Sequence, residues 1–168
     1  MKRLISPALL FACLVTPSLA QTPFAGMKNR IKADANTLIL INVDKMFGSP
    51  VADRERWAER RQAAYDAGLT ALPPDATQVL IAGRMEHGLD QAAWELAMVN
   101  LRNERNVTSV AQRYGGTMDE VEGRSAAHLP NDHYVVQLGT KLMASHTPPN
   151  RQSVARWLRG TDVTYTGP

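Results

Sequence analysis

The sequence lacks the residues and motifs from which an activity is usually identified. A single cysteine, Cys13, occurs in 168 residues, so the chain can form no disulfide within itself. No Gly-x-Ser-x-Gly motif indicates an α/β-hydrolase nucleophile, and no glycine-rich loop has the spacing of a phosphate-binding motif. The formal net charge is only +3, which gives no reason to expect nucleic-acid binding. The composition therefore favours a folded domain without a recognisable catalytic motif.

The first twenty residues contain the three regions of a secretory signal peptide. Lys2 and Arg3 are followed by an apolar run from residue 4 to residue 15. The small residues Ser18 and Ala20 then occupy the positions that a signal peptidase recognises. The run is too short for a membrane-spanning helix, which needs about 20 apolar residues. We therefore predict export to the periplasm or the extracellular space, with no transmembrane span after cleavage.

Cys13 leaves one alternative open for this segment. Cleavage before Cys13, at the sequence LFAC, would produce a lipoprotein. The bulky Phe11 and the continuation of the apolar run through Leu14 and Val15 argue against it. Cleavage after Ala20 would leave a chain without cysteine, whose stability must come from its hydrophobic core.

Hydrophobic runs and helix signals alternate along the rest of the chain. The predicted strands are 37–43, 77–85, 92–101, 117–121, 126–129, 133–139 and 140–146. The first of them, TLILINV, is rich in leucine and β-branched residues and is predicted to be buried on both faces. The predicted helix starts are Ser49 with Pro50 in the first helical position, Asn106, and either Thr147 or Asn150.

The clearest amphipathic helix follows Asn106. Val107, Val110, Ala111 and Tyr114 recur at spacings of three and four residues, which places them on one face of a helix. Two glycines come directly after this stripe and are expected to end the helix. The tryptophans, which also lie on apolar stripes or strands, are predicted to pack in the core: Trp57, Trp94 and Trp157.

The order of these elements predicts an α+β fold. A strand, a helix, two strands, a helix and a strand form the βαββαβ order of ferredoxin-like folds with split βαβ units, to which a β-meander and a C-terminal helix are added. The predicted organisation is a signal peptide (1–20), an exposed lead-in (21–36), one α+β domain (34–160) and a tail (161–168). The tail, TDVTYTGP, resembles a strand without its partner, so a truncated chain stays open as an explanation.

The segment HLPNDH is the densest group of candidate metal ligands. His128, Asp132 and His133 lie within six residues, in a chain that has four histidines. A zinc ion usually needs four protein ligands in a structural site and three in a catalytic site. Pro130, Asn131 and Asp132 are strong turn formers between two apolar runs. The pattern therefore favours a hairpin turn, and no cofactor is expected.

Two other charged groups have structural explanations. Asp119, Glu120 and Glu122 are typical of an edge strand, where charge prevents pairing with other sheets. In the segment DRERWAERR, Glu55 and Glu59 are three or four residues from arginines with which they can form ion pairs. This pattern favours a solvated helix face.

Two segments resemble an uncharacterised group of exported bacterial proteins. They are ADANTLILINVDKMFGSPVA near the start of the mature region and PPNRQSVARWLR near its end. The resemblance covers most of the mature chain and implies export and an α+β architecture. It contains no catalytic motif, so it implies no activity.

These observations favour an exported, non-catalytic α+β domain that binds a protein or cell-envelope partner, with no catalytic residues assigned. The alternative is a metal-dependent exported enzyme that uses His128, His133 and a distant third ligand. A regulatory or inhibitory domain that docks through its sheet is a third hypothesis. The sequence does not predict the oligomeric state.

Overall fold

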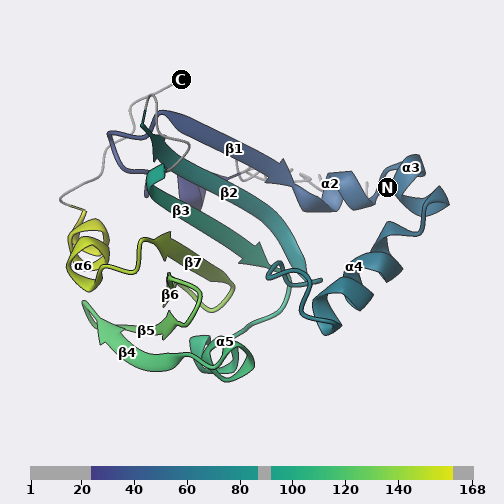
Figure 1. The fold of residues 1–168 in the computed structure, drawn as a ribbon. Helices are drawn as coiled ribbons and strands as arrows, with labels where there is room; N and C mark the ends of the chain where they lie inside the picture. Colours follow the sequence, from purple (N-terminus) through teal and green to yellow (C-terminus); the bar gives the residue numbers. More distant parts are fainter. Residues whose placement is uncertain (1–23, 87–91, 161–168) are drawn as a thin grey trace, which may run out of the picture.

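A sheet of seven antiparallel strands is the centre of the fold (Figure 1). The computed structural model describes residues 24–86 and 92–160. The strands are β1 (Thr37–Asn42), β2 (Ala76–Met85), β3 (Ala92–Leu101), β4 (Thr117–Val121), β5 (Arg124–Leu129), β6 (His133–Gln137) and β7 (Leu142–Thr147). Their order across the sheet is β1-β2-β3-β7-β6-β5-β4. Strands β1 to β3 therefore extend inward from one edge of the sheet, and β4 to β7 extend inward from the other edge. The two halves join where β3 pairs with β7.

Within the part of the chain that the structure describes, six helices precede, separate or follow these strands. They are α1 (Ala25–Lys28), α2 (Val43–Phe47), α3 (Pro50–Arg54), α4 (Trp57–Asp66), α5 (Val107–Tyr114) and α6 (Arg151–Arg159). The predicted N-caps Ser49, Asn106 and Asn150 are confirmed, because each side chain accepts a hydrogen bond from a backbone N–H in the first turn. The helix predicted to follow Ser49 is interrupted between α3 and α4, where Arg56 has a left-handed backbone with φ 53°.

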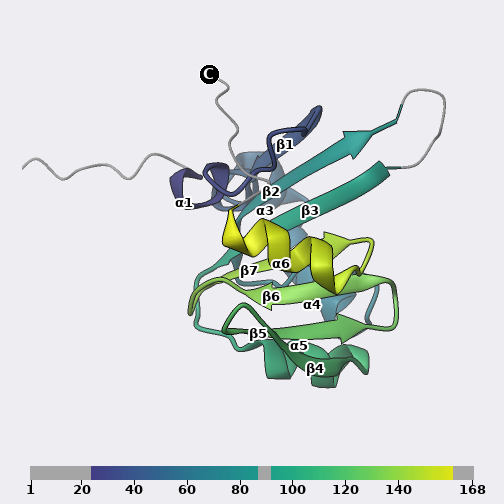
Figure 2. The same cartoon turned by 90° about the vertical axis from the view of Figure 1, so that its left-hand side faces the viewer.

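One face of the sheet, which we call the packed face, is filled by buried side chains. Leu80, Leu96 and Met98 have no exposed surface and alternate along β2 and β3, as expected for a strand with one face on a core. Val154 and Trp157 of α6 complete this core. In Figure 2, α6 lies across the near side of the sheet and α4 lies behind the sheet. The two helices therefore cover opposite faces.

The other face, which we call the open face, is only partly covered by helices. Val107 and Ala111 of α5 pack against Ala127, Leu129 and Val135 of β5 and β6. This small cluster confirms the predicted amphipathic helix, since its apolar stripe faces the sheet. On this face, α4 and the loop after it lie over the central strands.

The α+β class is confirmed, but the ferredoxin-like order is not. In a split βαβ unit the two strands that the helix joins are parallel, and another strand of the sheet lies between them. Strands β1 and β2 are direct antiparallel neighbours although three helices separate them in sequence. The run of β4, β5, β6 and β7 as successive neighbours is the predicted meander.

Two predictions about burial differ from the structure. The lead-in was predicted to be exposed, but Met27 and Ile31 are buried in the core of the packed face, because α1 closes one end of that core. Strand β1 was predicted to be buried on both faces, but Leu38, Ile39 and Leu40 are 37%, 46% and 41% exposed. This strand lies at an edge of the sheet and has only β2 as a neighbour.

Among residues 24–86 and 92–160, no helix has the length and apolar character that crossing a membrane requires. The strands predicted at 77–85 and 92–101 are confirmed as β2 and β3. The segment that joins them lies largely outside the described residues. The predicted signal peptide and the tail 161–168 also lie outside them.

Candidate functional site

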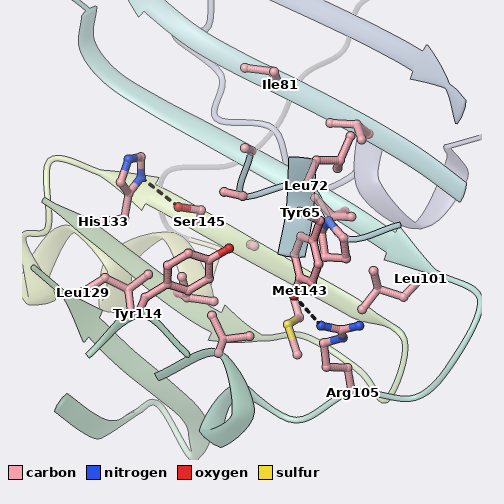
Figure 3. A pocket seen from close by; sticks show the side chains of 18 of the residues that line it. Tyr65, Leu72, Ile81, Leu101, Arg105, Tyr114, Leu129, His133, Met143 and Ser145 are labelled. Carbon is pink, nitrogen blue, oxygen red and sulfur yellow. Dashed lines mark hydrogen bonds between the residues drawn. The ribbon is translucent and has the colours of Figure 1, made fainter. Parts of the chain in front are cut away.

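A cavity of about 370 Å³ lies on the open face of the sheet (Figure 3). It lies between the central strands, α4, α5 and the loop of residues 71–73, and part of its rim is open to solvent. Its apolar lining is Ile41, Ala71, Leu72, Pro73, Val79, Ile81, Ala97, Val99, Leu101, Val110, Leu129, Val135, Met143 and Ala144. Ligand cavities in proteins typically measure about 300–1,000 Å³ and are mainly apolar with a few polar groups. This cavity has both properties.

The cavity exists because the two helices on this face cover different parts of the sheet. Ile81, Ala97 and Ser145 lie side by side across β2, β3 and β7, with their side chains on the open face. All three keep partial exposure although they belong to the central strands. The small side chain of Ala97 in the middle of this row leaves room that no helix side chain fills.

One end of the cavity has a partly buried ion pair. The guanidinium of Arg105 donates to Asp75 Oδ1 at 3.2 Å and to Tyr65 Oη at 2.9 Å. The side chains of Arg105 and Asp75 are only 27% and 14% exposed. This ion pair is therefore less accessible to solvent than the ion pairs on the exposed surfaces of the helices. The charge of Arg105 is therefore already neutralised within the protein.

The ring of Tyr65 is held between α4 and α5. The guanidinium of Arg113 lies over this ring, 3.9 Å from its centroid, in the geometry of a cation–π contact. Arg113 also donates a hydrogen bond to the backbone carbonyl of Tyr65. These contacts fix the wall of the cavity that Tyr65 forms.

Tyr114, which lines the cavity, has a hydroxyl without a hydrogen-bond partner among the described residues. Its oxygen is buried, and no described residue forms a hydrogen bond with it. Figure 3 shows the side chain directed from the end of α5 into the cavity. An unsatisfied buried hydroxyl costs about 1–3 kcal/mol, so a ligand, an ion or a water that supplies the hydrogen bond would be stabilised at this position.

The opposite end of the cavity carries His133 and two hydroxyl groups. His133 Nδ1 lies 3.0 Å from Ser145 Oγ and 2.8 Å from Thr147 Oγ1. A serine nucleophile needs a histidine that is oriented by a carboxylate. Among the residues described, no carboxylate forms a hydrogen bond with His133. The arrangement therefore provides hydrogen-bonding groups rather than a recognisable triad.

The structure does not bring His128 and His133 together. His128 pairs across the hairpin with Tyr134, and its ring lies 5.9 Å from the Tyr134 ring. Tyr134 belongs to the packed face, whereas His133, one residue earlier, points to the open face. The two imidazoles thus lie on opposite faces of the sheet. Asp132 lies between them in an exposed turn with φ 60°.

A third histidine belongs to a separate environment on the packed face. His146 is 1% exposed, and its Nδ1 lies 3.0 Å from the carbonyl oxygen of Pro148. Because a carbonyl only accepts, Nδ1 must carry the proton, and Nε2 accepts from Lys32 Nζ at 2.8 Å. His87 lies outside the described residues. Nowhere in 24–86 and 92–160 are three or more His, Cys, Asp or Glu residues grouped to bind a metal ion.

The acidic run lies on the edge strand β4, as predicted, and has a structural role. Asp119 accepts hydrogen bonds from the Tyr134 hydroxyl and from Arg151 Nε of α6. These two bonds hold the pKa of Asp119 below its ordinary value of 3.8, although desolvation acts in the opposite direction. Burial and the Asp119 carboxylate raise the pKa of Tyr134 to about 12. The group ties α6 to the edge of the sheet.

The polar groups of the cavity are not predicted by the sequence pattern. Tyr114 was recognised only as the last member of an apolar stripe. Its hydroxyl was the available signal, because a leucine at this position would have packed as well without a polar atom. Nothing in the sequence indicates that Arg105 and Tyr65 meet, since 40 residues separate them.

Comparison of the chain with protein-family models, with curated proteins and with solved structures gave no match.

Proposed function

We propose that this protein is an exported, non-catalytic binding protein whose cavity holds a small, mainly apolar component of the cell envelope. The observation that carries the proposal is the buried hydroxyl of Tyr114, which has no hydrogen-bond partner among the described residues and lies inside a mainly apolar cavity. A bound molecule would replace the solvent contacts of the apolar wall and supply the missing hydrogen bond.

The polar groups around the cavity support binding rather than a reaction. Arg105 is engaged by Asp75 and Tyr65, and His133 by two hydroxyl groups. Side chains that are held in this way can orient a ligand without becoming part of a chemical step. The signal-peptide pattern of residues 1–20 supports a location where envelope components are available.

A cavity-filling substitution tests the proposal. Ala97→Leu would place three additional carbon atoms in the middle of the cavity wall, and Ala63→Leu on the exposed side of α4 is the matched control. We would titrate each protein with N-phenyl-1-naphthylamine, an uncharged dye that becomes fluorescent in apolar surroundings. We expect saturable binding by the natural protein and by the Ala63 variant, and binding at least about tenfold weaker in the Ala97 variant.

Equal binding by all three proteins would contradict the proposal, because the dye would then bind elsewhere. Absence of binding to the natural protein would contradict it directly. Near-ultraviolet circular dichroism would verify that the Ala97 variant keeps its tertiary packing. Native mass spectrometry of the protein purified from its envelope fraction would then give the mass of a co-purified molecule.

A further inference from the structure

We infer that the molecule bound in this cavity is uncharged and carries an oxygen that forms a hydrogen bond with Tyr114. The inference rests on the proposed binding function and adds the chemical class of the ligand. It follows from the charge balance of the cavity wall and from the hydrogen-bonding capacity of its two tyrosines.

The charge balance excludes a ligand whose affinity depends on an ion pair. Arg105 is the one Lys or Arg among the residues that line the cavity, and its guanidinium already binds Asp75 and Tyr65. An anionic ligand would have to displace Asp75 from Arg105, or share the guanidinium with it and so place two negative charges beside one cation. That carboxylate is mostly buried, and its Oδ2 has no hydrogen-bond partner among the described residues. Its displacement would therefore leave a buried charge unpaired, which is strongly unfavourable.

A cationic ligand is disfavoured by the same groups. None of the residues that line the cavity is an Asp or a Glu, so the wall offers a positive charge no carboxylate of its own. The fixed cation of Arg105 faces the same space. A neutral molecule avoids both costs and keeps the ion pair of Arg105 and Asp75 intact.

The hydroxyl groups define what the neutral molecule must offer. A phenol oxygen can donate one hydrogen bond and accept others. Tyr114 Oη forms none with the described residues, whereas Tyr65 Oη accepts from Arg105 and keeps its own proton to donate. Both tyrosines line the same cavity. A ligand oxygen of an alcohol, ether or carbonyl group satisfies this need, and a pure hydrocarbon does not.

A set of four ligands with one common ring system separates these requirements. We would compare naphthalene, 2-methoxynaphthalene, 2-naphthol and 2-naphthoate by competition with the fluorescent dye at about pH 7, where a carboxylic acid is ionised and a phenol is not. Each would be measured with the natural protein and with Tyr114→Phe. Tyr134→Phe removes a hydroxyl from the packed face and is the matched control.

We expect 2-methoxynaphthalene and 2-naphthol to bind the natural protein about three- to tenfold more tightly than naphthalene, which corresponds to one neutral hydrogen bond. Tyr114→Phe should remove this preference, because the hydroxyl is lost, and Tyr134→Phe should keep it. The charged 2-naphthoate should bind at least about tenfold more weakly than 2-naphthol.

The possible failures are distinguishable. Binding of naphthalene without any preference for the oxygen-bearing ligands, or a preference that persists in Tyr114→Phe, would overturn the inference and leave the proposed function intact. Equal or tighter binding of 2-naphthoate would also overturn it, because an anion would then be accepted. Absence of binding by all four ligands would overturn both the inference and the proposed function.

Discussion

Asp132, in the turn of the HLPNDH segment, has a backbone conformation that glycine adopts more easily. Its φ of 60° lies in the left-handed region, where a side chain costs roughly 1–2 kcal/mol and Asp or Asn costs less than other residues. We expect Asp132→Gly to keep or slightly raise the free energy of unfolding, and Asp132→Val to lower it by about 1–2 kcal/mol. Urea denaturation of the two variants would measure both changes.

The same variants test the metal hypothesis for His128, Asp132 and His133. If the turn explains these residues, elemental analysis should find the same metal content in Asp132→Gly as in the natural protein. A stoichiometric transition metal in the natural protein that is lost in this variant would contradict the turn explanation. It would also make the metal-dependent enzyme the better hypothesis.

Asp119 is expected to make the free energy of unfolding depend on pH in the acidic range. Its pKa is lowered in the folded protein, first by the hydrogen bond from Tyr134 and then by the bond from Arg151. A carboxylate of this kind stabilises the fold above its unfolded pKa, and the contribution is lost as the pH falls through the folded pKa. We expect the difference in unfolding free energy between the natural protein and Asp119→Asn to be constant from about pH 7 to pH 5 and to shrink below about pH 3.8.

Chemical denaturation at a series of pH values would measure this difference. Arg151→Met is the matched control, since it removes one of the two hydrogen bonds and should weaken the pH dependence without abolishing it. A difference that stays constant down to about pH 2.5 would show that Asp119 titrates equally in the folded and unfolded chains.

At the scale of elements, the end of α5 depends on two glycines with different constraints. Gly115 has φ 67° but open space where a side chain would lie. Gly116 has an ordinary backbone, but an added Cβ would lie 2.5 Å from Leu129 Cδ2 and 2.8 Å from the His128 carbonyl oxygen. The first glycine allows the helix to end, and the second allows α5 to approach β5 closely.

Alanine substitutions should therefore have unequal effects. We expect Gly115→Ala to lower the free energy of unfolding by about 1 kcal/mol through backbone strain, and Gly116→Ala to lower it by about 2–3 kcal/mol through overpacking. Because Leu129 also lines the cavity, Gly116→Ala should weaken dye binding as well. Equal losses of stability, measured by thermal and urea denaturation, would contradict the close approach of α5 to β5.

Most of the elements could be predicted because their signals are local. The cap at Asn106 and the stripe that ends at Tyr114 lie within one short segment, and the structure confirms the helix. The burial of β1 could not be predicted, because the apolar pattern of TLILIN is compatible both with a central strand and with an edge strand. The position of Ile31 also depends on residues far along the chain, since its neighbours in the core belong to β2, β3 and α6.

At the scale of the whole molecule, the order of the strands and the cavity result from contacts between distant segments. The pairing of β3 with β7 joins residues such as Ala97 and Ser145, and no local pattern specifies it. The cavity wall takes Tyr65 from α4, Arg105 from the segment before α5, and Tyr114 from the end of α5. A site assembled from so many segments has no motif, so the sequence could not reveal it.

The two faces of the sheet differ in how much additional volume they can accept. Ala82, on the packed face, has no exposed surface and belongs to the main core, whereas Ala97, on the open face, lines the cavity. Both alanines lie in the central strands β2 and β3. The same substitution at these two positions therefore compares a filled face with an unfilled one.

We expect Ala82→Leu to lower the free energy of unfolding by about 1–3 kcal/mol, because a well-packed core must shift to accept the added carbon atoms. Ala97→Leu should change it by less than about 0.5 kcal/mol or raise it, because its side chain enters space that is already empty. Urea denaturation without ligand would measure both values. A loss at Ala97 as large as that at Ala82 would mean that the open face is as tightly packed as the other, and the cavity could then hold no ligand.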